Sequence, residues 1–330
     1  MEGPDFSCFI LPKLNLCDVE KVVKKAYHKE GDPGRPPRKP MGIFKALIVK
    51  RLQQIPSERE LCRRLWKDDT LRELCDVEAE EKPYHPSQLS RFKKNIGNRR
   101  LQRIMNKLLK ELVEAGLISG ETVVLDATFV KAYSRRDPHD NSRGKSDPEA
   151  RVGRDGKTFE LGYKLHISTD AKSELPLAVI VAPANDNEKK HAPALFHRAL
   201  KATEHLIKTF IADPQYSSMK LRELLSANGV KAVKPYPANQ EKEVDVLRVD
   251  KYFRTHGPAL EKEIYRQRSV IERVNSRQKE QLCLERHRAR GLERLTTHAL
   301  LSMIAMLLNA VAALRLNRPE KARSITMLAR

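Results

Sequence analysis

The sequence predicts an α/β protein with a mixed five-stranded sheet and flanking helices, preceded by an all-helical domain. Two observations predict this. Up to about residue 118 the segments read as helices, and Ser57 with Glu60 three residues later is a helix-start signal. After Gly120, apolar runs rich in β-branched residues alternate with polar turns. We therefore expect a helical domain over 1–118, an α/β domain over 119–318 and a basic C-terminal tail over 319–330.

The charge balance indicates a polyanionic partner. The 330 residues carry a formal net charge of +20, and 40% of them are hydrophobic, which is enough for a core. Nucleic acid is the usual partner of such a chain, with an anionic membrane surface as the competing possibility. No signal peptide opens the sequence, and we interpret the apolar run 299–316 as a buried helix. Five scattered cysteines without a CxxC pair indicate a reducing cytoplasm and no zinc site.

The N-terminal part predicts short helices in a helix-turn-helix-like arrangement. One covers 47–55, after the proline-rich stretch 34–40; others follow the acidic loop 76–83, one of them stopping at Gly97 and a longer one ending at Gly116. Because the helix that stops at Gly97 is basic, its candidate DNA-contacting residues are Arg91, Lys93 and Lys94. The alternative is an ordinary helical cap domain.

The second part predicts the order β-β-β-α-β-α-β-α, which fits a ribonuclease-H-like fold. Its polar stretch 134–158 reads as a long loop, and a hairpin turn is expected at 170–173. Along 162–170 the residues alternate, with Leu165 and Ile167 on one face and Lys164 and His166 on the other. The polar pair adds two candidate DNA contacts.

Three acids stand at distinctive places in this order. Asp126 lies inside the first strand, Asp213 at the end of the fourth, and Glu272 in a basic helix near the end. Each has an ordinary explanation: a hydrogen-bonded aspartate, a turn residue, and an i,i+4 ion pair with Arg268. Together they converge at one end of such a sheet. Three carboxylates suit hard divalent cations, so we expect two Mg²⁺ ions about 4 Å apart, with Mn²⁺ as a possible substitute.

The segment 265–279 predicts one helix with a narrow polar stripe. At 3.6 residues per turn, Tyr265, Arg268, Glu272 and Lys279 fall within about 60° of one another. An aromatic hydroxyl and two cations beside an acid can contact nucleic-acid phosphates, whereas the simpler interpretation is a solvated face with ion pairs.

These residues carry a family resemblance. The spacing Y-x2-R-x3-E-x6-K from Tyr265 to Lys279, together with LDATFVKA around Asp126 and ADPQYSS around Asp213, resembles the DDE transposases of prokaryotic insertion sequences, in the insertion sequence four superfamily near its insertion sequence five branch. The resemblance spans about residues 35–315. One position departs from it, because Gln215 stands where the family usually has a small residue.

The resemblance implies an enzyme that cuts and rejoins DNA, with Asp126, Asp213 and Glu272 as catalytic metal ligands. It also implies terminal inverted repeats and target DNA as partners, a homodimer in the DNA complex, no membrane association, and a cytoplasmic, nucleoid-associated location. Two alternatives stay open: a catalytically inactive DNA-binding relic, and a related ribonuclease-H-like nuclease that cuts without joining.

Overall fold

The computed structural model describes residues 17–25, 39–216, 218–233 and 259–325. Predictions about the proline-rich stretch 34–38 and the last five residues of the basic tail lie outside the described residues. The chain divides into two compact units. One comprises Val113–Ser276 with Arg290–Leu292, and the other comprises Met1–Leu112, Arg277–Ala289 and Glu293–Arg330.

In its described residues, the first of these units is built on a mixed six-stranded sheet. Its strands are β1 (Thr122–Lys131), β2 (Arg151–Asp155), β3 (Thr158–Asp170), β4 (Pro176–Pro183), β5 (Thr209–Ala212) and β6 (Lys231–Val233). Their order is β2-β3-β1-β5-β6, with β4 also paired to β3. The pairs β1–β3, β2–β3 and β3–β4 are antiparallel, whereas β1–β5 and β5–β6 are parallel. The predicted order of elements is confirmed apart from one added strand.

The added strand, β2, corrects the predicted long loop and the predicted count of five strands. It forms a hairpin with β3 in which Asp155 pairs with Thr158 across a two-residue turn. The first turn residue, Gly156, has φ +59°, which suits such a turn. The polar composition of 134–158 hid this strand, although the Asp-Gly pair at 155–156 was the signal that could have found it.

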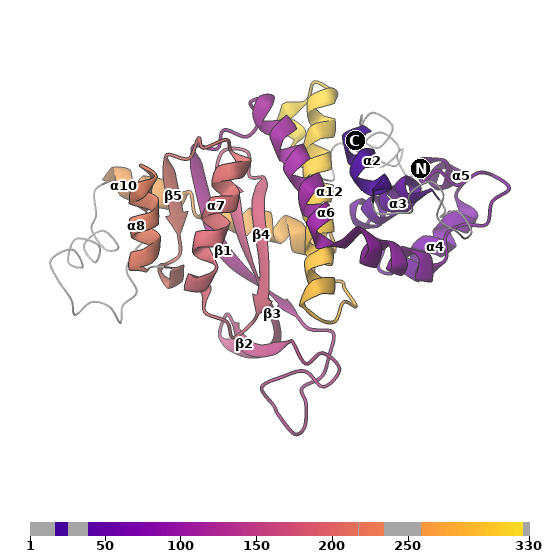
Figure 1. Ribbon diagram of the computed structural model, residues 1–330, viewed down its shortest axis with the longest axis horizontal. Helices are drawn as coiled ribbons and strands as arrows, with labels where there is room; N and C mark the ends of the chain where they lie inside the picture. The colour runs from indigo at the N-terminus through magenta and orange to yellow at the C-terminus, as the bar shows by residue number, and fades with distance from the viewer. Residues whose placement is uncertain (1–16, 26–38, 217, 234–258, 326–330) are drawn as a thin grey trace. The chain divides into compact units, whose positions relative to one another are not determined.

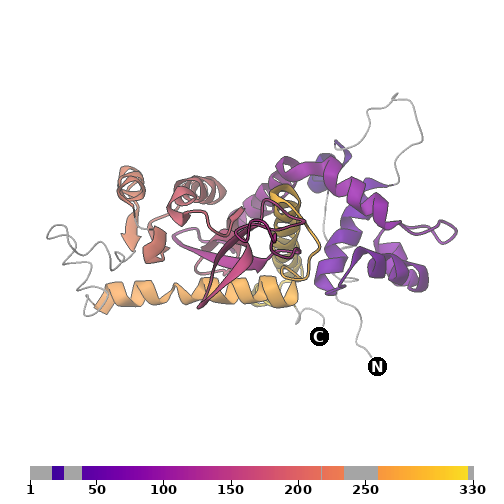
Figure 2. The same ribbon diagram turned by 90° about the horizontal axis from the view of Figure 1, so that it is seen from below.

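Helices cover both faces of the sheet (Figures 1 and 2). On one face lie α7 (Ala192–Ala202), against β3 and β4, and α8 (Met219–Ala227), against β6. On the other lie α10 (Ala259–Arg266) and α11 (Ser269–Ser276), and α11 contacts β1 (Figure 2). Because both faces are covered, most residues of β3 are buried and its polar alternation does not mark a solvent face.

The other unit is helical throughout its described residues. It contains α2 (Cys17–Lys24), α3 (Pro40–Leu52), α4 (Glu58–Lys67), α5 (Asp69–Leu74), most of α6 (Pro86–Glu114) and nearly all of α12 (Leu292–Arg315). The expected helix start is confirmed, since Ser57 Oγ accepts a hydrogen bond from the Glu60 amide at 3.1 Å. The expected stop at Gly97 is a kink inside α6, with φ +64° and ψ 162°.

The helix α12 joins the C-terminal part of the chain to these N-terminal helices. Thr297 Oγ1 donates to Asn98 Oδ1 at 2.7 Å, and the Arg315 guanidinium lies 2.6 Å from Glu111 Oε1. By length and hydropathy α12 could cross a membrane, but 89% of its most apolar window is buried within the structure, which is what a core helix also shows. The helical unit is therefore not confined to the residues before the predicted boundary at 118–119. It also contains residues 277–289 and the residues after 292.

Candidate active site

The first two predicted acids are neighbours where the parallel pairing of β1 with β5 ends. Leu125 of β1 pairs with Ala212 of β5, so the next residues along each strand, Asp126 and Asp213, lie side by side. Asp126 Oδ1 accepts a hydrogen bond from the Ala127 amide at 2.8 Å, and Asp213 Oδ1 accepts one from the Gln215 amide at 2.9 Å. Both carboxylates are thus oriented by backbone groups.

A single guanidinium connects all three predicted acids. Arg268 Nη1 lies 2.9 Å from Asp126 Oδ2 and 3.8 Å from Asp213 Oδ2. Arg268 Nη2 lies 3.4 Å from Glu272 Oε1. The structure therefore brings the three acids together, and it places Arg268 between them, where we had expected a side chain facing DNA. The predicted Arg268–Glu272 pair exists, but it is one part of a larger cluster.

The backbone around Arg268 corrects the prediction of one continuous helix over 265–279. The helix α10 ends at Arg266 and α11 begins at Ser269. Between them the backbone tightens, because the amides of Arg268 and Ile271 donate to the carbonyls three residues earlier. After Ser276 the chain forms a π-helical turn, η4 (Arg277–Gln281). Arg268 therefore projects from a break between two helices.

Burial makes the site unfavourable for negative charge. The Asp126 side chain is 19% exposed, and its burial raises its pKa to about 6, against the opposing effect of Arg268. The nearby charges of Asp213 and Glu188 act in the same direction as burial. A cation beside these acids offsets that cost, and Arg268 supplies it here.

The residues fit a hard divalent cation in their chemistry. The cluster offers only carboxylate oxygens, and it already attracts one cationic side chain. Within the described residues, no three His, Cys, Asp or Glu side chains are close enough together to hold a metal ion as they stand. A bound ion would therefore require the carboxylates to close around the position that the guanidinium now occupies.

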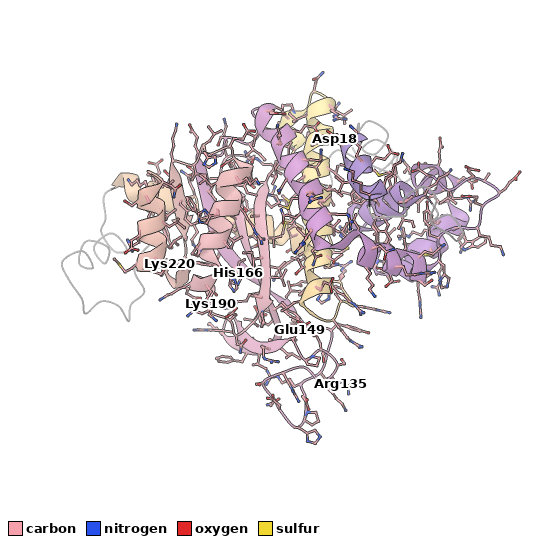
Figure 3. The ribbon with its side chains drawn as sticks, viewed as in Figure 1. Asp18, Arg135, Glu149, His166, Lys190 and Lys220 are labelled. Atoms are coloured by element: carbon pink, nitrogen blue, oxygen red, sulfur yellow. The ribbon has the colours of Figure 1, made fainter. Side chains whose placement is uncertain are left out.

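Two predicted DNA contacts on β3 serve other partners. His166 is fully buried, and its Nδ1 lies 2.7 Å from the Tyr216 hydroxyl; Figure 3 labels it. Burial lowers the pKa of His166 to about 3, so the imidazole is neutral. Lys164 Nζ lies 2.6 Å from Glu188 Oε1, and this pair is mostly buried. The prediction that His166 contacts DNA is therefore wrong for this structure, because its side chain has no solvent-exposed surface that DNA could contact.

The other predicted DNA contacts are only partly available. Arg91 and Lys94 are exposed on α6, whereas Lys93 forms an ion pair with Glu58. Lys279 belongs to the helical unit, where its ammonium lies 2.9 Å from Glu285 Oε1. Tyr265 is half-buried on α10. Their roles toward DNA stay predictions.

Sequence reasoning missed Glu188 and the role of Tyr216. Glu188 begins the 3₁₀ turn η1 (Glu188–Lys190) and is buried. With the Gln215 amide nitrogen turned toward it, Glu188 accepts hydrogen bonds of 3.1 and 3.3 Å. Nothing in NEKKH marks this acid as buried, since its partners lie far away in sequence.

Family models match both parts of the chain. The family model described as Transposase DDE domain matches residues 119–308, and the one described as Transposase domain (DUF772) matches residues 6–95. The first match alone covers more than half of the chain.

Solved structures with similarity include transposase complexes. The piggyBac transposase synaptic complex with hairpin DNA is 11% identical over 98% of this chain and 79% of that chain, with a TM-score of 0.49. The Mos1 transposase paired-end complex with left transposon end is 13% identical over 75% and 80%, with a TM-score of 0.24. The Mos1 mariner paired end complex with Mn is 13% identical over 79% and 85%, also with a TM-score of 0.24. At these TM-scores the family matches, not the structural likenesses, identify the chain.

Proposed function

Because this chain belongs to the Transposase DDE domain family, it is a DNA transposase, and we propose that Asp126, Asp213 and Glu272 are its catalytic acids. One observation carries the proposal: all three carboxylates lie within 4 Å of the same guanidinium. The acids come from a central strand, its parallel neighbour and a helix on one face of the sheet. Such a strand order supports a ribonuclease-H-like assignment for the α/β unit.

DDE transposases use divalent metal ions, and we infer that the three acids of this chain would hold two Mg²⁺ ions, with Mn²⁺ as a substitute. Ions there would lower the barrier to attack on a phosphodiester by activating the attacking oxygen and stabilising the leaving one. Asp126 and Asp213 would contribute carboxylates already oriented by the Ala127 and Gln215 amides. Arg268 would leave its place between the acids and become available to a DNA phosphate.

The remaining expectations follow from the same assignment. The Y-x2-R-x3-E-x6-K spacing supports membership of the insertion sequence four superfamily, near its insertion sequence five branch. The substrates would be the terminal inverted repeats of an element and a target DNA, held by a homodimer in the cytoplasm, at the nucleoid. Arg91 and Lys94, which are exposed on α6, would contact DNA, as would Tyr265 of α10. The family matches do not favour an inactive DNA-binding relic or a nuclease that cuts without joining.

The test is cleavage of a labelled element end by a Glu272→Gln variant, under Mg²⁺ and under Mn²⁺. Gln has almost the same size and helix propensity, so folding should change little. The Glu272 side chain is 64% exposed, so losing its ion pair should cost well under ~1 kcal/mol of unfolding free energy. We expect cleavage to be lost while thermal stability is kept.

Glu280→Gln is the matched control, because Glu280 is an exposed acid eight residues later in the same segment. It should cut like the wild type. Wild-type cleavage by Glu272→Gln would leave only the ion-pair role for Glu272 and would overturn the triad.

A further inference from the structure

The turn after Asp213 is the least regular part of the proposed site. The strand β5 ends at Ala212, and the 3₁₀ turn η2 (Pro214–Tyr216) follows Asp213 directly. Its own hydrogen bonds are few: the Gln215 amide donates to Asp213 Oδ1, and the Tyr216 amide donates to the Asp213 carbonyl at 3.0 Å. These bonds orient the Asp213 carboxylate within the turn, whereas the position of so short a turn relative to the sheet depends on contacts with other elements.

Two connections attach this turn to β3. The Tyr216 hydroxyl lies 2.7 Å from His166 Nδ1, with both side chains fully buried. The second connection is a chain of hydrogen bonds. The side-chain amide of Gln215 donates to Glu188, and Glu188 also accepts from Lys164 Nζ at 2.6 Å. A buried hydrogen bond between two fully packed rings allows little movement, and a charge-assisted bond is stronger than a neutral one.

Both connections approach from the face opposite the acids. Asp126 pairs with Ile167, and His166 pairs with Ala127, so Asp126 and His166 point to opposite faces of the sheet. The His166 ring stacks near His191, just before α7, with ring centroids 4.6 Å apart, whereas Arg268 lies between α10 and α11. Tyr216 and His166 can therefore act on Asp213 without touching DNA or a metal ion.

We propose that the Tyr216–His166 bond and the Gln215–Glu188–Lys164 chain are a positioning device that fixes the Asp213 carboxylate relative to Asp126. This rests on the proposed role of both acids as metal ligands. Gln215, which departs from the family's usual small residue, is then a working part of the device in this chain. Lys164 and His166 act through the turn, which explains why neither side chain is placed for DNA.

The test measures Mn²⁺ binding by calorimetry on the full-length protein without DNA, and element-end cleavage against metal concentration. Tyr216→Phe removes only the hydroxyl and keeps the ring. Removing a group that is hydrogen-bonded directly to a metal ligand typically weakens metal affinity about 10- to 100-fold. The Tyr216 hydroxyl acts on Asp213 only through the turn, so we expect Mn²⁺ affinity to fall by the lower end of this range, about 10-fold. Excess Mn²⁺ should restore most of the cleavage rate, and DNA affinity should be unchanged. Gln215→Ala should shift affinity in the same direction but less, because Gln215 is exposed.

Tyr163→Phe is the matched control. Tyr163 is another fully buried tyrosine, on β3 itself, and its hydroxyl donates to Asp147 at 2.7 Å. Its loss should reduce stability without changing Mn²⁺ affinity. Equal Mn²⁺ affinity in Tyr216→Phe and wild type overturns the positioning role, and so does an equal loss in both tyrosine variants, which would indicate general loosening.

Asp213→Asn separates this inference from the proposed function. If Asp213→Asn loses Mn²⁺ binding and cleavage while Tyr216→Phe keeps both, the triad stands and the positioning device fails. If Asp213→Asn itself binds Mn²⁺ and cuts normally, the proposed function fails first.

Discussion

His166 illustrates how one buried residue sets a pH dependence. Its pKa is lowered from an ordinary value of 6.5 to about 3 by burial, so the unfolded chain binds a proton between these values and the folded protein does not. Stability therefore falls as pH drops below 6.5. Between pH 7 and pH 5 this residue alone should cost about 2 kcal/mol of unfolding free energy.

Urea unfolding of wild type and His166→Gln at both pH values measures this effect. The variant should lose less stability than wild type on acidification. His139→Gln, at an exposed loop position, should behave like wild type. Identical pH dependence in wild type and His166→Gln would contradict a buried neutral imidazole.

The residues of the site were predictable to different degrees. Asp126 and Asp213 could be found because an acid inside or directly after an apolar strand is unusual. Glu272 was found by its spacing from Tyr265 and Arg268. The place of Arg268 among the acids could not be found, because helical geometry assumed an unbroken helix. His166 was misassigned because alternation cannot distinguish a solvent face from one covered by α7.

Among the elements, α6 depends on a single glycine for its bend. Gly97 has φ +64° and ψ 162°, a region that essentially only glycine occupies. A Cβ added there would meet no atom within 4 Å, so the cost of Gly97→Ala is backbone strain alone. We expect it to destabilise the protein by about 1–3 kcal/mol, although alanine is the better helix former.

Chemical denaturation measures this cost, with Ser90→Ala as the control at an exposed position of the same helix. That substitution should be neutral or slightly stabilising. A Gly97→Ala variant at least as stable as wild type would show that α6 can straighten without cost. The stop at Gly97 and a longer helix beyond it were both predictable from sequence. That the two helices meet directly at a kink was not, since that depends on packing on both sides.

For the whole molecule, the net charge of +20 predicts a strong salt dependence of DNA binding. Each phosphate neutralised by Lys or Arg releases condensed counterions, so affinity falls steeply as salt rises. Between 50 and 200 mM salt we expect a loss of about 10³-fold or more for the full-length protein on an element end. Fluorescence anisotropy at several salt concentrations measures the slope, and a flat slope would contradict DNA as the main partner.

The division of the chain was the least predictable feature. Sequence composition changes near residue 118, and that change is real, since the first strand starts at Thr122. The return of α12 to the N-terminal helices depends on contacts such as Thr297 with Asn98, which lie about two hundred residues apart. Local patterns carry no information about pairings at that separation.

The discontinuous helical unit has a consequence for synthesis. A ribosome makes the helices up to Leu112 first and the partner helix α12 nearly last. The hydrophobic core of the helical unit therefore cannot be completed until most of the protein has been translated. The sheet, by contrast, has all six strands that the structure describes once Val233 has emerged. A premature stop before α12 would therefore leave the earliest-made helices without their apolar partner, and such truncated chains should be substrates for chaperones and proteases.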